Sequence, residues 1–128
     1  MPKWVHTNVF DNGLNVVKNT ANEMLLITSY SPGDTYATVS ARSVCSVNMA
    51  PADIVLGNFG TNERQLTIAA KTGTATTNSP ATPDLAVALV DSTNGVVLAV
   101  ADETSDQQIT SGNPINFPIW HLRGRQPT

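Results

Sequence analysis

Cysteine, aromatic side chains and charge are all scarce in this sequence of 128 residues. Cys45 is its single cysteine, so neither a disulfide within the chain nor a zinc site built from cysteines can form. Charged residues make up 13% of the chain, and the net charge is −3. A protein that binds nucleic acid usually presents a basic face, so this charge argues against nucleic acid as a partner.

Catalytic and metal-binding patterns are missing as well. His6 and His121 are the only histidines, one near each end of the chain, which leaves few candidates for a general base. The sequence contains neither a Gly-x-Ser-x-Gly motif nor a phosphate-binding loop. Asp102 and Glu103 are adjacent acids, but neighbouring side chains on an extended chain point in opposite directions. We therefore predict no enzymatic activity, no catalytic or metal site and no cofactor.

Long apolar runs are also absent. The longest, residues 95–101, is far shorter than the roughly 20 residues that a membrane-spanning helix needs. The first six residues contain no apolar segment of the kind found in secretion signals. We expect a soluble protein that is made in a cytoplasm and has no membrane partner.

Hydroxyl and amide side chains take the place of charge, with 16 Thr, 12 Asn and 9 Ser. Residues 72–83 contain neither charge nor a large apolar side chain, which predicts an exposed loop. Residues 81–113 carry five acids and no base, whereas residues 114–128 carry Arg123 and Arg125 and no acid. Two interpretations of these arginines stay open: a contact with an acidic partner surface, or solvated side chains at a frayed terminus.

Hydrophobic periodicity predicts one short helix followed by strands. Asp11 is a candidate N-cap, and apolar residues then recur at helical spacing over residues 12–20. The clearest pattern is a hairpin of two apolar strands, 85–90 and 96–101, with Asn94-Gly95 in the loop between them. Both strands are apolar on both faces, which predicts a central position between two layers. Other strands are expected at residues 24–30, 36–40, 43–47, 64–71 and 113–122, while residues 53–57 fit a strand or a helical turn and residues 57–62 form a turn cluster.

These elements predict a mainly all-β fold, a β-sandwich or jelly-roll-like single domain over residues 1–128 with one short N-terminal helix and extended termini. Pro118 lacks a backbone donor, so the strand at 113–122 is expected at a sheet edge or a bulge. Cys45 lies among small and β-branched neighbours, which predicts a buried, unreactive thiol.

Four of the seven aromatic residues lie near the two ends of the sequence, at Trp4, Phe10, Phe117 and Trp120. One interpretation is a packed cluster where the first and last segments meet. The other is that exposed tryptophans anchor a partner interface, because tryptophan is enriched at binding hot spots.

Three stretches together carry a family resemblance: residues 4–15, residues 85–93, and residues 98–100 leading to 109–120. Their order resembles small virion proteins of tailed bacteriophages, which act with the major capsid protein as cement or decoration proteins. The resemblance spans most of the chain and rests on packing and turn residues. It implies a β-sandwich subunit of the virion that associates with itself as a dimer or trimer, binds the outer surface of the major capsid protein lattice and stabilises the head.

On this resemblance, we expect the two ends of the chain and the loop at 72–83 to form the protein interface. The candidate interface residues are Trp4, Phe10, Phe117, Trp120, His121, Arg123 and Arg125. Deleting residues 121–128 is expected to weaken capsid binding and to leave a folded domain. Two alternatives stay open, another virion component (tail, collar or fibre base) and a carbohydrate-binding β-sandwich module that uses the tryptophans.

Overall fold

The computed structural model describes residues 4, 6–103 and 106–125. Within them, nine strands form three antiparallel sheets, and the predicted mainly β, sandwich-like fold is confirmed. The helices are α1 (Thr7–Thr20), α2 (Tyr36–Ala41) and a 3-10 turn, η1 (Pro51–Asp53). The strands are β1 (Glu23–Ile27), β2 (Ser43–Asn48), β3 (Ile54–Gly60), β4 (Glu63–Ile68), β5 (Lys71–Thr74), β6 (Ala86–Asp91), β7 (Val96–Asp102), β8 (Pro114–Phe117) and β9 (Trp120–Gly124).

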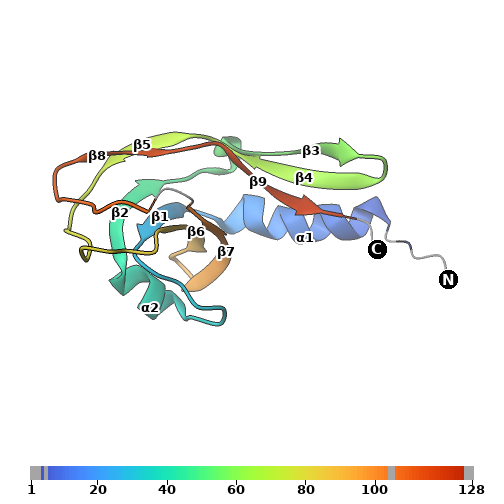
Figure 1. Cartoon of the computed structure of the whole chain (residues 1–128). Helices are drawn as coiled ribbons and strands as arrows, with labels where there is room; N and C mark the ends of the chain where they lie inside the picture. The colour runs from blue at the N-terminus through green and yellow to red at the C-terminus, as the bar shows by residue number, and fades with distance from the viewer. Residues whose placement is uncertain (1–3, 5, 104–105, 126–128) are drawn as a thin grey trace.

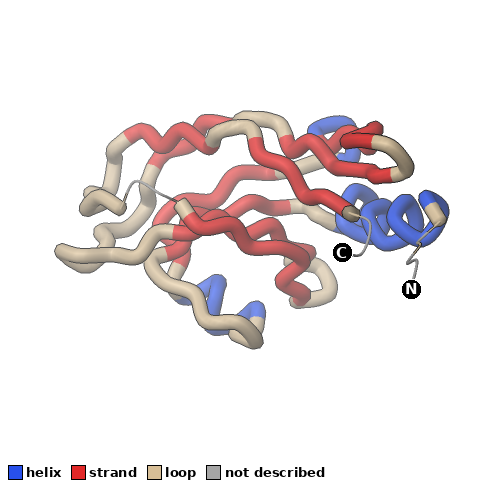
Figure 2. The backbone as a smooth tube through the Cα atoms, turned by 45° about the vertical axis from the view of Figure 1, so that its right-hand side comes forward, coloured by secondary structure: helices blue, strands red, loops and turns tan. Residues whose placement is uncertain are grey.

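The molecule has two layers (Figures 1 and 2). Sheet A has the strand order β2-β1-β6-β7, sheet B the order β3-β4-β9, and sheet C consists of β5 and β8. Sheets B and C lie end to end in the upper layer of Figure 1, with sheet A below sheet C and α1 below sheet B. One half of the molecule is therefore a sheet on a sheet, and the other half is a sheet on a helix.

Sheet A is buried on both of its faces. Leu26, Val87 and Leu89 belong to the main core that sheets B and C and helix α1 also line. The opposite face carries Leu25 and Ala88 in a second core under α2. Because β6 lies between β1 and β7, it is buried along its whole length, as its apolar sequence predicts. The same prediction is wrong for β7, which is an edge strand and only half-buried.

The predicted hairpin at residues 85–101 is confirmed, and a buried carboxylate closes its loop. Asp91 is 5% exposed. Its side chain accepts hydrogen bonds from the backbone N–H groups of Thr93 and Asn94 and from Asn94 Nδ2, at 3.1, 3.3 and 2.8 Å. Gly95 adopts φ of 65°, a conformation that glycine reaches without strain.

Helical structure departs from the sequence prediction at two places. Helix α1 begins at Thr7 rather than at residue 12, so Asp11 lies inside it and pairs with Arg64 at 2.7 Å instead of capping the helix. Residues 36–40, predicted as a strand, belong to α2. The Thr35 side chain caps that helix by accepting a hydrogen bond from Thr38 N–H, and Val39 is fully buried against sheet A. Five alternating residues are too few to separate a strand from a capped helical turn.

The predicted exposed loop at 72–83 is partly wrong. Its first residues belong to β5, which pairs with β8. Ala75 and Ser79 are buried. The backbone N–H of Ser79 donates to the carbonyl of Ile109 at 2.8 Å, and the N–H of Ile109 donates to the Ser79 hydroxyl at 2.7 Å. Backbone hydrogen bonds hold this segment, so it needs no large apolar side chain to be ordered.

The segment at 113–122, predicted as one strand, is divided at Pro118 into β8 and β9, and both are edge strands, as the proline predicts. Strand β8 pairs with β5 in sheet C, and β9 pairs with β4 in sheet B. Ile115 and Phe117 are buried, whereas Ile119 lies beyond the break and is 59% exposed. In the described part of the chain, no helix is long and apolar enough to cross a membrane.

Candidate functional site

The two faces of sheet B differ in what they contact. Paired residues in a sheet share a face, so the register places Leu56, Leu66 and Leu122 in one row, which packs into the main core beside α1. The row formed by Val55, Thr67 and His121 faces the other way. Val55 is 59% exposed, and His121 is exposed as well. We call this second surface the outer face of sheet B.

Hydrogen bonds between strands order the polar side chains of the outer face. Thr67 Oγ1 and His121 Nδ1 lie 3.3 Å apart. In the next row, Arg123 Nε donates to Gln65 Oε1 at 3.0 Å. These contacts join β4 to β9, the edge strand that supplies the basic residues of the C-terminal segment.

Two arginines share one aromatic ring on this face. The guanidinium carbon of Arg123 lies 4.1 Å from the centre of the Phe59 ring, and that of Arg125 lies 4.9 Å from it. A cation over an aromatic face at an exposed site contributes about 0.5–1 kcal/mol. Both guanidinium groups therefore contact Phe59 of β3, and both arginines are exposed.

The first and last described segments lie at the same end of the molecule, at the right of Figure 1. Phe10 of α1 packs so closely on β9 that a Cβ added to Gly124 would lie 2.7 Å from the ring. Trp4, just before the helix, is 61% exposed. Arg64 donates to Asn58 and pairs with Asp11, which fixes the β3–β4 hairpin on the same end of α1.

Two of the predicted interface residues point inward. Phe117 is 2% exposed and belongs to the main core, so its prediction as an interface residue is wrong for this chain. Trp120 pairs with the fully buried Ile68 on the inner face of sheet B and is half-buried. Its indole N–H is buried and has no hydrogen-bond partner among the described residues. The exposed candidates are Trp4, His121, Arg123 and Arg125, with Phe10 half-buried between α1 and β9.

Sequence patterns missed the partners of these residues. Phe59 and Gln65 hold the arginines, but residues 57–62 have the composition of a turn cluster. In the structure, β3 extends through Gly60 and the turn is confined to Thr61 and Asn62, the latter with φ of 58°. No local signal reports that β3, β4 and β9 become neighbours.

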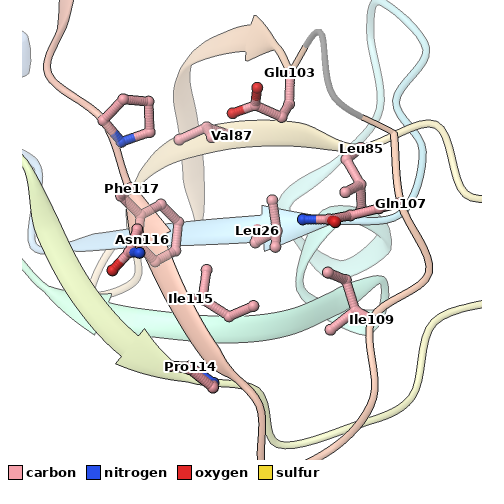
Figure 3. Close-up of a pocket in the computed structure, with 11 residues that line it drawn as sticks. Leu26, Leu85, Val87, Glu103, Gln107, Ile109, Pro114, Ile115, Asn116 and Phe117 are labelled. Carbon is pink, nitrogen blue, oxygen red and sulfur yellow. The ribbon is translucent and has the colours of Figure 1, made fainter.

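A cavity of about 320 Å³ opens between sheet A and β8 (Figure 3). Most of its lining residues are apolar, and Glu103, Gln107 and Asn116 add a polar part to its walls. The cavity exists where the two-stranded sheet C covers only part of the four-stranded sheet A. The apolar lining residues are Leu26, Leu85, Val87, Ile109, Pro114, Ile115, Phe117 and Pro118.

Two titratable side chains in the described part of the chain have a pKa that departs from its ordinary value. Burial raises the pKa of the Cys45 thiol, in keeping with the predicted unreactive cysteine. The backbone N–H of Ala50 and the ammonium of Lys71 both bind the Asp53 carboxylate, and they lower its pKa. No group of three or more His, Cys, Asp or Glu side chains among the described residues is arranged to hold a metal ion.

Comparison with protein-family models, with curated proteins and with solved structures found no significant match for this chain.

Proposed function

We propose that this chain is a structural protein of a tailed-bacteriophage head, which binds the outer surface of the major capsid protein lattice as a cement or decoration protein. In this proposal, the outer face of sheet B docks on the shell. The observation that carries it is an exposed sheet face on which two arginines are held over Phe59.

Positioned arginines suit recognition of an acidic protein surface. A guanidinium that is already fixed loses little conformational freedom on binding, so more of its interaction energy appears as affinity. Val55, which is 59% exposed on the outer face of sheet B, adds apolar area to this surface. Each contact is modest, but a lattice offers many identical sites, and linked contacts at neighbouring sites multiply the affinity.

Rebinding to stripped particles tests the proposal. Particles purified from the natural source of the chain are washed in high salt to remove it, and purified chain is then added back. Wild-type chain is expected to rebind in a fixed ratio to the major capsid protein. The double variant Arg123→Ala, Arg125→Ala is expected to bind about tenfold more weakly or worse, because interface arginines are frequent hot spots.

Arg42→Ala is the matched control. Arg42 lies between α2 and β2 and pairs with Asp34, so its replacement removes one positive charge away from sheet B, as each single arginine substitution does on it. It is expected to rebind as the wild type does. Absence of the chain from the particles, or equal binding by the double variant, would contradict the proposal.

Point substitutions test this surface better than deletion of residues 121–128 does. Residues 121–124 form most of β9, which pairs with β4 and places Leu122 beside the fully buried Leu66. Deleting residues 121–128 would remove Leu122 and expose the core beside α1. The truncated chain is therefore expected to lose stability rather than to remain an intact folded domain.

Fractionation of the particles into heads and tails distinguishes a head protein from the alternative virion components. A tail, collar or fibre-base component would appear in tail fractions rather than with empty heads. A carbohydrate-binding role has less support, because the half-buried Trp120 lies on the inner face of sheet B, which leaves Trp4 as the exposed tryptophan among the described residues.

A further inference from the structure

We propose that Trp4 of one copy of this chain inserts into the cavity between sheet A and β8 of a second copy. The contact concerns self-association alone, and it requires no capsid. It would explain two features that the single chain leaves open, an exposed tryptophan and a half-open cavity with apolar walls and a polar rim.

The cavity has the size and lining that an indole ring requires. An apolar cavity of about 150 Å³ holds a benzene ring. The cavity here measures about 320 Å³, and Leu26, Val87 and Phe117 are among its walls. At its rim, the Glu103 carboxylate is an acceptor for the indole N–H, which usually finds a hydrogen-bond partner when tryptophan is buried (Figure 3).

Charge favours this pairing of surfaces. Residues 1–6 contain Lys3 and no acid. The cavity is bordered by the acidic segment, with Glu103 at the rim and the Asp106 carboxylate bound to the backbone N–H of Leu85, itself a lining residue. The N-terminal segment of one copy and the cavity rim of another therefore carry opposite charge.

The chain's own Trp4 is too far away to fill the cavity. Trp4 precedes the first turn of α1, whereas the cavity-lining Leu26 lies on β1, beyond the other end of that helix (Figure 1). A helix of 14 residues is about 21 Å long. The residues from Trp4 to Thr7 span at most about 10 Å when extended. A second copy is the occupant that the geometry allows.

The contact joins two different surfaces, so its symmetry limits the assemblies that it can form. Repetition in one direction gives a ring if the rotation closes and an open filament if it does not, and reciprocal insertion within a pair gives a dimer. Each of these products has a larger mass than the single chain, so the mass reports the interaction.

Tryptophan fluorescence tests the insertion directly. In the variant Trp120→Phe, Trp4 is the only remaining tryptophan. The indole N–H of Trp120 has no partner among the described residues, so phenylalanine is expected to be tolerated there. As concentration rises, the emission of Trp4 is expected to shift to shorter wavelength in step with the increase in mass measured by sedimentation.

Complementary variants identify the two surfaces. Trp4→Ala removes the inserted side chain, and Gln107→Trp fills the mouth of the cavity from an exposed position. Each variant alone is expected to lose self-association by tenfold or more in Kd. A mixture of the two is expected to recover a heterodimer, because the first has an intact cavity and the second an intact Trp4. Val16→Ala, at a position 56% exposed on α1, is the control and is expected to associate as the wild type does.

Three results would each overturn the inference. They are a wild-type chain that remains monomeric up to millimolar concentration, a Trp4→Ala variant that associates normally, and association with no change in the Trp4 emission. Binding of an apolar dye in the cavity without any self-association would likewise assign the cavity to a small molecule. Because the assay uses purified chain alone, its outcome is separate from that of the particle-binding experiment.

Discussion

Replacing Gly73 by alanine tests the packing of sheet C against sheet A. Gly73 lies on β5 opposite Ile115 of β8, where the two layers approach. A Cβ at this position would lie 2.8 Å from Val47 Cγ1 and 2.9 Å from Cys45 Sγ. Carbon atoms in favourable contact are about 3.5–4.0 Å apart, so one layer must move. Cys45 is fully buried in β2, which leaves it little room to yield.

The expected cost of Gly73→Ala is about 1–3 kcal/mol, the usual range for an extra methyl group in a packed core. For a domain of this size, each 1 kcal/mol lowers the Tm by about 3–5 °C. Urea unfolding monitored by circular dichroism measures the change in the free energy of unfolding. The rate at which a thiol reagent modifies Cys45 provides a second readout, and it should rise because the thiol becomes accessible when the layers separate.

Gly13→Ala is the matched control, because it makes the same chemical change in open space. Gly13 lies within α1, and nothing is within 4 Å of a Cβ added there. Alanine is favoured over glycine inside a helix by roughly 0.5–1 kcal/mol, so this variant should be more stable than the wild type. Combining Gly73→Ala with Cys45→Ala should recover part of the lost stability, since the closest sulfur is removed. A Gly73→Ala variant as stable as the wild type would refute the close approach of the layers.

Three further predictions concern side chains outside that contact. Asp91→Ala should cost about 1–3 kcal/mol in urea unfolding, because two backbone N–H groups and the Asn94 amide lose their acceptor; an unchanged midpoint would contradict this role. Asp53 has a lowered pKa when folded, so its stabilising contribution is complete above its ordinary value near 3.8 and is lost as the pH falls through the lower folded value. Asp53→Asn should therefore be less stable than the wild type at pH 7, with the difference in Tm closing below pH 3.8; a pH-independent difference would argue against it. Gly124→Ala should destabilise the packing of β9 on α1, and Phe10→Leu should relieve part of that effect in a double-mutant cycle.

Local signals predicted the parts of the fold that local interactions determine. The β6–β7 hairpin follows from two apolar runs around Asn94-Gly95, and Pro118 interrupts its strand because it has no N–H to donate. The strand predicted at residues 36–40 is wrong, because the Thr35 side-chain cap and the burial of Val39 favour a helix over the alternating pattern. The prediction of an exposed loop at residues 72–83 is partly wrong, because the backbone of this segment forms hydrogen bonds with partners elsewhere in the chain.

The candidate site was predictable only in part for a similar reason. The basic end of the sequence indicated Arg123 and Arg125, but their orientation depends on Phe59, more than 60 residues away. Phe117 was expected at an interface although it shares a strand face with the buried Ile115. Aromatic content near a terminus is thus a weaker guide than strand alternation.

A reconstruction of the particles that contain this chain tests the central proposal most directly. The expected map has the domain on the outside of the shell, with the outer face of sheet B, Arg123 and Arg125 included, against the major capsid protein. A particle without density for the chain on its head, or a domain that contacts the shell only through α2 and leaves sheet B facing solvent, would contradict it.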